Sequence, residues 1–146
     1  MKYFYSIITV LLFATLAFAA RKHLPGKENI HFFKGSWEQA VLEAKKENKP
    51  LFVDVYATWC GPCQMLKHIT FSNKEAAAFY NTSFINLSLN GEEREGTAIA
   101  ARYSLKGYPS LLYFDKNGKL ILYAAGYVGP AEFIQIAQEA FKRLQH

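Results

Sequence analysis

The sequence predicts an α/β domain in which a central mixed β-sheet is flanked by helices on both faces. Three observations lead to this prediction. Strand-forming runs alternate with helical segments along the chain, which favours parallel pairing. The run 51–56 is almost entirely apolar, as expected for a central strand buried on both faces. Two further strand-like runs flank the turn 115–118, which indicates an antiparallel hairpin. The predicted order is βαβαβαββα.

The first elements are a brief strand at 30–33 and a helix with a clear start signal. Ser36 and Gln39 form a capping-box pattern, in which each residue satisfies a backbone amide of the other. The helix is predicted to run to about Asn48 and to end before Pro50, since proline cannot continue a helix.

Helical composition returns after the strand 51–56. It covers 62 to about 69, with a predicted break at 70–71 and a restart at a second capping box over 72–75. The segment 84–89 then alternates apolar with polar residues and is predicted to be a strand.

The remaining elements complete the sheet and cover it. A shorter helix is predicted over 97–104, with Gly107 as a left-handed stop. The hairpin consists of strands 110–114 and 119–124. The last helix covers 130–144 and has proline at its favoured first position. Its apolar stripe is made of Phe133, Ile134, Ala137 and Phe141.

Length and charge fit one domain. A chain of 146 residues, 51% of them hydrophobic, can bury a single core. The 17 Lys and Arg give a net charge of +5, but they are interleaved with 12 Asp and Glu. That pattern is typical of a solvated surface, so we expect no nucleic-acid partner. A monomer is expected.

The N-terminal region is predicted to be a secretory signal peptide. Lys2 precedes an apolar centre at about 7–18, and Ala17 and Ala19 form a small-residue cleavage site. The alternative is an uncleaved membrane anchor, because the uncharged run approaches the roughly 20 apolar residues that span a bilayer. We expect export to the periplasm, with membrane contact only if this segment is retained.

Cleavage after Ala19 divides the chain into three parts. These are a signal peptide at 1–19, a polar linker at 20–29 and the folded domain at 30–146.

Cys60 and Cys63 are the only cysteines, which excludes a framework of structural disulfides. A zinc site needs about four N or S ligands, and the four histidines do not lie at the spacing of a second ligand pair. No metal or cofactor is therefore expected. A redox role has a physical basis, because a strand leading into a helix places Cys60 at the helix N-terminus, where the dipole and free amides favour a thiolate.

The two cysteines have different predicted roles. Cys60 is expected to be the exposed nucleophile, which forms a mixed disulfide with a client, and Cys63 the inward-facing thiol that resolves it. Gly61 and Pro62 are candidate client-binding residues, and Pro62 also stiffens the loop. Trp59 is predicted to shield the site and contact a partner. The alternative for Trp59 is a place in the core.

Asp54 and the pair Tyr108-Pro109 complete the candidate site. A carboxylate in a buried strand is costly without a partner or a raised pKa. Asp54 lies six residues before Cys60, so it is predicted to sit beneath the cysteines and exchange a proton when Cys63 reacts. The alternative is that Asp54 lies at the solvent-exposed end of the strand. A cis bond before Pro109 would leave backbone free to pair with an extended client, although trans is the commoner form. The charged run 92–95 is predicted to be a solvated loop.

The motif Trp59-Cys60-Gly61-Pro62-Cys63, with Asp54 and Tyr108-Pro109, resembles the thioredoxin family from about His31 to the C-terminus. Segments 52–59 and 70–73 are similar to the exported branch that includes the C-terminal domain of DsbD-type disulfide-interchange proteins. The resemblance implies a thioredoxin fold, nucleophilic Cys60, resolving Cys63, a buried acid at Asp54 and a cis peptide before Pro109. It also implies a reducing poise.

One position departs from the family pattern. Cytoplasmic thioredoxins commonly carry a lysine on the strand beside the buried acid, whereas the matching stretch 84–87 offers Asn86. The departure affects the expected proton transfer and potential but not the exchange chemistry.

The sequence therefore predicts a thiol–disulfide oxidoreductase that reduces or exchanges disulfides in client proteins through Cys60 and Cys63. The resemblance implies a membrane-bound thiol reductase as electron donor. Two alternatives stay open: a net disulfide oxidase or isomerase, and a redox-inactive module that binds peptides beside Pro109.

Overall fold

A computed structural model describes residues 29–145 of the chain. The predicted signal peptide, its cleavage site and nearly all of the linker lie outside these residues. Within the described part, no helix is long and apolar enough to cross a membrane.

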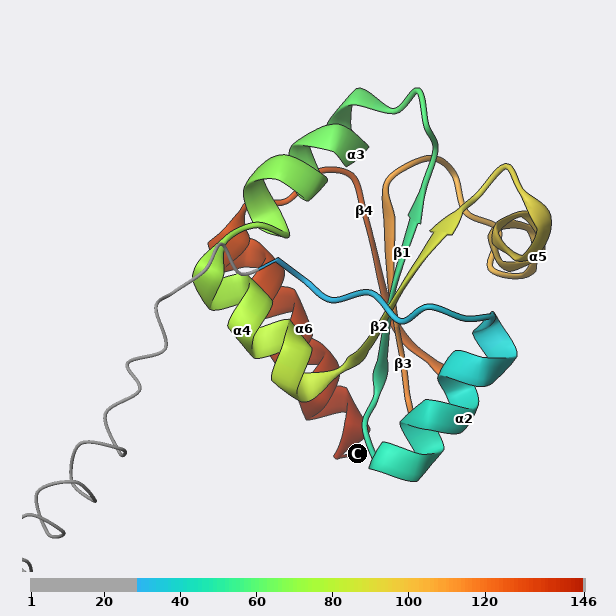
Figure 1. Ribbon diagram of the computed structural model, residues 1–146, viewed down its shortest axis with the longest axis vertical. Helices are drawn as coiled ribbons and strands as arrows, with labels where there is room; N and C mark the ends of the chain where they lie inside the picture. Colours follow the sequence, from blue (N-terminus) through green and yellow to red (C-terminus); the bar gives the residue numbers. More distant parts are fainter. Residues whose placement is uncertain (1–28, 146) are drawn as a thin grey trace, which may run out of the picture.

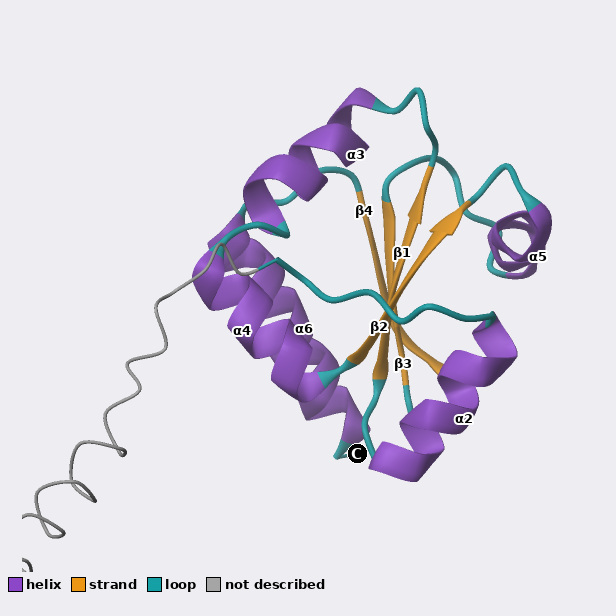
Figure 2. Cartoon of the chain, in the orientation of Figure 1, coloured by secondary structure: helices purple, strands orange, loops and turns teal. Residues whose placement is uncertain are grey.

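The sheet contains four strands in the order β2-β1-β3-β4, and Figure 2 shows them running through the centre of the domain. The central strand β1 (Leu51–Tyr56) pairs in parallel with β2 (Ile85–Asn90). On its other side it pairs antiparallel with β3 (Ser110–Phe114), which forms the predicted hairpin with β4 (Leu120–Ala125). The sheet is therefore mixed, as the sequence predicts.

Helices cover both faces of the sheet (Figure 1). One face carries α2 (Trp37–Glu47) and α5 (Arg94–Arg102). The other carries α4 (Lys74–Ser83) and α6 (Pro130–Leu144), together with α3 (Gly61–Met65) and the π-helical turn η1 (Leu66–Thr70) that continues it. The predicted flanking of the sheet on both faces is confirmed.

The two faces of the sheet have different cores. The face under α4 and α6 is aromatic: Phe52 from β1 packs against Tyr80, Tyr113 and Phe133. The buried Tyr80 hydroxyl donates to the Phe133 carbonyl at 2.8 Å and lies 2.7 Å from the Tyr113 hydroxyl, so both phenols have partners. The face under α2 and α5 is mainly aliphatic, with Val53 and Val55 of β1 at its centre. Residues of β1 therefore alternate between two dry layers, which fixes the register of the central strand.

The capping box at the start of α2 forms as predicted. The Ser36 hydroxyl accepts a hydrogen bond from the Gln39 amide at 3.2 Å, and the Gln39 side chain accepts one from the Ser36 amide at 2.9 Å. The helix ends at Glu47, and Asn48 takes the left-handed conformation with φ of 53°.

The prediction of a first strand at 30–33 is wrong. Only Phe32 forms an isolated parallel bridge, to Asn86 of β2. The neighbouring amides turn to different elements: Ile30 donates to the Phe71 carbonyl at 2.9 Å and Phe33 to the Asn86 carbonyl at 2.7 Å. The segment crosses from η1 to the sheet edge, so it cannot build a ladder along either.

The boundaries of two helices also differ from the prediction. Asn73, not Ser72, caps α4 by accepting from the Ala76 amide at 3.0 Å, because the Ser72 hydroxyl donates to the His68 carbonyl at 2.6 Å. Helix α5 begins at Arg94 and ends at Arg102 instead of covering 97–104. The left-handed residue after it is Ser104, with φ of 51°, and not Gly107.

Candidate active site

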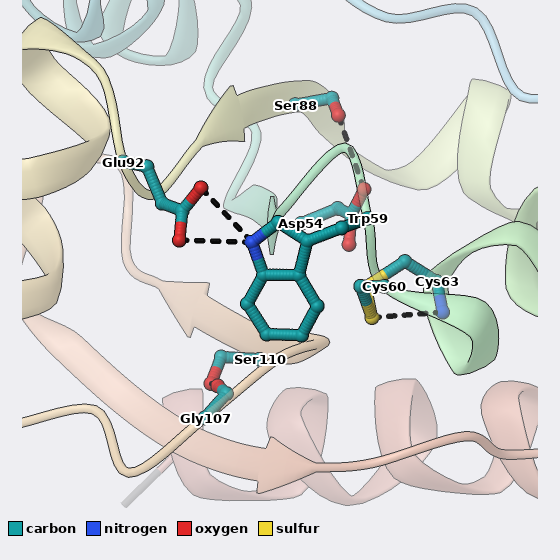
Figure 3. Close-up of a disulfide and its surroundings, with 8 residues drawn as sticks. All are labelled: Asp54, Trp59, Cys60, Cys63, Ser88, Glu92, Gly107 and Ser110. Atoms are coloured by element: carbon teal, nitrogen blue, oxygen red, sulfur yellow. Dashed lines mark hydrogen bonds between the residues drawn. A yellow bond between two sulfur atoms is a disulfide. The ribbon is translucent and has the colours of Figure 1, made fainter.

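Cys60 and Cys63 form a disulfide where the chain passes from β1 into α3, with their Cα atoms 5.3 Å apart. Cys60 is the N-cap of α3, and its sulfur accepts a hydrogen bond from the Cys63 amide at 3.2 Å (Figure 3). An amide aimed at this sulfur favours negative charge on it when the bond is reduced. The local geometry therefore distinguishes the two cysteines chemically.

The prediction that Cys60 is the exposed cysteine is wrong for this disulfide form. Cys60 is 2% exposed and Cys63 is 7% exposed. The pair forms a small buried cluster with Ala57, against which Tyr56 and Tyr108 pack. A residue that precedes a helix is not exposed when side chains from other elements, here Tyr56 and Tyr108, pack against it.

Trp59 forms the outer side of the site. Its indole N–H donates to both carboxylate oxygens of Glu92, at 3.0 and 3.1 Å (Figure 3), and its ring meets the edge of Tyr108 with centroids 6.2 Å apart. The side chain is 71% exposed, so the alternative of a core position is wrong. Glu92, expected only to be solvated, is thus a contact of the site that the sequence did not reveal.

Tyr108 and Pro109 lie opposite Trp59, and the peptide bond between them is cis, as the family resemblance implies. The Tyr108 ring packs so closely on Gly91 that a Cβ there would overlap it. Pro109 is buried, and its carbonyl accepts from the Gly126 amide at 2.9 Å. Gly61 and Pro62 are exposed, and nothing lies within 4 Å of the position of a Cβ on Gly61. The structure therefore places all five predicted client-binding residues around the disulfide loop or the turn facing it.

Asp54 lies on the inner side of the site. It is the fourth residue of β1 and only 6% exposed, so the alternative of a wet strand end is wrong. Its Oδ2 accepts a hydrogen bond from the Ser88 hydroxyl at 3.0 Å, whereas Oδ1 has no partner among residues 29–145. Burial raises the pKa of Asp54 from 3.8 to about 7, and the Ser88 hydrogen bond acts in the opposite direction.

A cavity of about 230 Å³ joins Asp54 to Cys63. Its wall is completed by residues of the sheet, α3, η1 and the segment before α2, which are Phe32, Tyr56, Gln64, Lys67, Phe71 and Ser88. Cys60 does not line this cavity. The buried acid and the second cysteine therefore line the same cavity.

The residue beside the acid is Ser88 and not Asn86, which corrects the sequence analysis. The strand register pairs Asp54 with Ser88, whereas Asn86 pairs with Phe52. The Asn86 side chain donates to the His31 and Tyr80 carbonyls, each at 3.4 Å. Both polar residues alternate onto the same face of β2, so strand periodicity alone could not select between them.

A family model described as a thioredoxin-like domain matches residues 37–141. The chain belongs to the thioredoxin-like family.

Relatives with curated names agree with this assignment. The thiol:disulfide interchange protein DsbD of Yersinia pestis is 32% identical over 103 residues, which cover 68% of this thioredoxin-like chain and 17% of DsbD. The chloroplastic M-type thioredoxin of Spinacia oleracea is 36% identical over 84 residues, which cover 58% of this chain and 41% of the relative. The matched part thus spans about a sixth of the length of DsbD.

Solved structures extend the likeness to three dimensions. A Bacteroides thetaiotaomicron protein proposed to be a disulphide isomerase has a TM-score of 0.72 at 30% identity, covering 80% of this chain and 97% of its own. The oxidised C-terminal domain of Neisseria meningitidis DsbD has a TM-score of 0.61 at 23% identity, covering 76% and 98%, and supports the fold alone. In a thioredoxin-like domain, the Cys60–Cys63 pair fits a redox-active site.

Proposed function

We propose that this protein is an exported thiol–disulfide oxidoreductase that reduces or exchanges disulfides in client proteins by cycling Cys60 and Cys63 between dithiol and disulfide. One observation carries the proposal: the sulfur of Cys60 accepts an amide hydrogen bond, while Cys63 shares a cavity with a buried acid whose pKa is about 7. One cysteine is thus suited to attack and the other to exchange a proton.

The proposed reaction starts from the dithiol. The Cys60 thiolate attacks one sulfur of a client disulfide, and the other client sulfur leaves as a thiolate. Cys63 then gives its proton to Asp54 and attacks the Cys60 sulfur, which restores the Cys60–Cys63 disulfide and releases the second client thiolate. Two electrons pass from the protein to the client, and solvent protonates the client thiolates.

Asp54 is suited to this step because its pKa lies close to neutral pH. An acid with a pKa of about 7 is present in both forms at physiological pH, so it can accept a proton in one half of the cycle and return it in the other. An ordinary exposed aspartate would be almost fully ionised there and a poor donor.

The client is proposed to contact the outer side of the site. The residues assigned to this contact are Trp59, Gly61, Pro62, Tyr108 and Pro109. The wide exposure of Trp59 and the open space beside Gly61 support the assignment, since both leave room for a peptide next to the disulfide. Because the disulfide itself is nearly covered, a client sulfur reaches Cys60 only when the covering side chains move aside.

Location and partners belong to the same proposal. Residues 1–19 would direct export to the periplasm, and 20–29 would link them to the domain at 30–146. A membrane-bound thiol reductase would supply electrons. A mature protein that begins at Ala20 would support cleavage, whereas recovery of the full-length chain in the membrane fraction would support an anchor.

The function is tested by reduction of insulin with dithiothreitol as electron source. The parent should accelerate the turbidity rise, and Cys60→Ser should not. Equal inactivity of both proteins would favour a redox-inactive module. A reduction potential close to the roughly −270 mV of thioredoxin supports a reductase, whereas one near −120 mV would indicate an oxidase.

Alkylation of the reduced protein tests accessibility. The rate of iodoacetamide labelling at Cys60, followed by mass spectrometry across pH, should titrate with a midpoint below the ordinary thiol pKa of about 8.5. A residue 60 that reacts no faster than a free thiol at any pH would overturn the assignment of Cys60 as nucleophile.

A further inference from the structure

The two oxygens of the Asp54 carboxyl group have different surroundings. Oδ2 is held by the Ser88 hydroxyl at 3.0 Å, and both residues line the cavity that reaches Cys63. Oδ1 is buried and has no partner within the described part of the chain. The carboxyl group is thus fixed by one oxygen and leaves the other available.

Ser88 reaches Asp54 because of the sheet itself. The two residues are direct partners in the parallel pairing of β1 with β2. The backbone hydrogen bonds of the sheet therefore fix the distance between their Cα atoms. A serine side chain has a single χ1 torsion, and the rotamer present here brings its hydroxyl to Oδ2 of Asp54. The hydrogen bond therefore joins the central strand β1 to the edge strand β2.

The other groups around the cavity do not take over this contact. Its titratable lining consists of Tyr56 from β1, Cys63 from α3 and Lys67 from η1, in addition to Asp54. Over residues 29–145, none of these three forms a hydrogen bond or ion pair with the Asp54 carboxyl group, whereas Ser88 does.

We propose that Ser88 is a positioning residue for the exchange reaction: its hydroxyl fixes Oδ2 of Asp54 so that Oδ1 serves as the oxygen that exchanges the Cys63 proton. This inference rests on the function proposed above. A hydroxyl suits the task because it can donate to Oδ2 both in the carboxylate and in the acid protonated at Oδ1, where Oδ2 is the carbonyl oxygen. It therefore keeps its contact with Oδ2 in both states of Asp54 without adding a charge beside the acid.

The first test measures Asp54 directly in the oxidised protein, where no cysteine titrates. The side-chain carboxyl carbon of Asp54 is followed by ¹³C NMR across pH in the parent, Ser88→Ala and Ser88→Thr. Loss of a hydrogen bond to the charged form should raise the Asp54 midpoint by about one pH unit in Ser88→Ala. Ser88→Thr, which keeps a hydroxyl, should titrate like the parent.

The second test measures the step that Asp54 is proposed to serve. A mixed disulfide of glutathione on Cys60 is prepared at low pH, and release of glutathione by Cys63 is timed after a jump to each pH. A midpoint raised by one unit lowers the ionised fraction of an acid with a pKa near 7 about fivefold at pH 7. Ser88→Ala should therefore release glutathione roughly fivefold more slowly at pH 7, and nearly as fast as the parent above about pH 9.

Two controls distinguish failure of the role proposed for Ser88 from failure of the proposed function. Alkylation of Cys60 in a Cys63→Ala background should be unchanged by Ser88→Ala, and unfolding curves should show that all variants are folded. If Ser88→Ala follows the parent in both the NMR titration and the release profile, the role of Ser88 is overturned while the oxidoreductase function stands. If the parent forms no mixed disulfide on Cys60, the function itself fails.

Discussion

The two sides of the disulfide differ in kind. The outer side is aromatic and open, with Trp59 held by Glu92 and resting against Tyr108. The inner side is a cavity lined by one acid, Asp54, whose carboxyl group accepts a hydrogen bond from the Ser88 hydroxyl. This difference suggests a division of labour, in which the outer side selects what reaches Cys60 and the inner side controls the proton of Cys63. Substitutions on the two sides should then change different kinetic quantities.

The largest effect on insulin reduction is expected at Cys63, which is bonded to Cys60 and lines the inner cavity. Cys63→Ala removes the thiol that resolves the mixed disulfide, so insulin reduction should fall to the background rate and clients should remain attached to Cys60. Non-reducing gels of cell extracts and mass spectrometry of the trapped peptides measure this. Cys60→Ser is the matched control and should trap nothing. Adducts in both variants would show that the two cysteines are not divided as proposed.

The next largest effect concerns the free energy of unfolding, which should depend on pH through Asp54. Because burial raises the pKa of Asp54 from 3.8 to about 7, the folded protein binds more protons than the unfolded chain between these values. Stability from the neutral acid is complete below about pH 4 and is lost as the pH rises through 7. The loss should be roughly 4 kcal/mol, from about three pH units at 1.36 kcal/mol each.

Urea unfolding of the oxidised protein from pH 4 to 8 measures this loss. Asp54→Asn removes the titrating group, so the difference between parent and variant isolates its contribution from that of other carboxylates. If the difference does not change with pH, Asp54 does not have the raised pKa that proton exchange requires.

A smaller effect is expected on the outer side. Trp59→Ala removes an exposed ring that is proposed to contact clients, so KM for insulin should rise about three- to tenfold while kcat stays within about twofold. The pH midpoint of glutathione release should not move. Leu42→Ala is the control, since Leu42 is an exposed apolar residue on α2, far from α3 in Figure 1. A shifted pH midpoint in Trp59→Ala would contradict the division of labour.

The smallest effect is expected at Glu92. Glu92→Gln keeps one oxygen that can accept from the Trp59 indole and loses only an exposed charge, so KM should change less than about twofold. Glu92→Ala, which removes the acceptor, should raise KM by about two- to threefold, less than Trp59→Ala does. Equal and unchanged KM values in both Glu92 variants would mean that the hydrogen bond does not orient Trp59 for clients.

The site residues that could be predicted from the sequence are mostly those that a local sequence pattern identifies. Asp54 was identifiable because a charge interrupts an apolar strand, and the capping box of Ser36 needs only residues three apart. Ser88 was not identifiable, because its importance depends on the register between two strands that are 34 residues apart. Glu92 was missed for a similar reason, since its contact with Trp59 joins two separate loops.

The errors in the fold have the same origin. Residues 30–33 have strand-forming side chains, but their amides are divided between η1 and β2, which no local pattern reveals. The burial of Cys60 depends on Tyr56 and Tyr108 packing over the loop, and Tyr108 comes from a turn almost fifty residues later in the chain. Local propensity thus predicted the elements, and tertiary contacts decided their boundaries and exposure.

Asp54 is carried by the central strand, which has hydrogen-bonded neighbours on both sides and leads directly into the disulfide loop. The acid is therefore anchored in the centre of the sheet, whereas the groups proposed to meet clients lie in loops and in the first turn of α3. Substitutions in the proposed client contacts can therefore change during evolution which clients bind, while Asp54 and the two cysteines keep their positions. The same holds for designed variants: client choice can be altered at the client contacts without changing Asp54, Cys60 or Cys63.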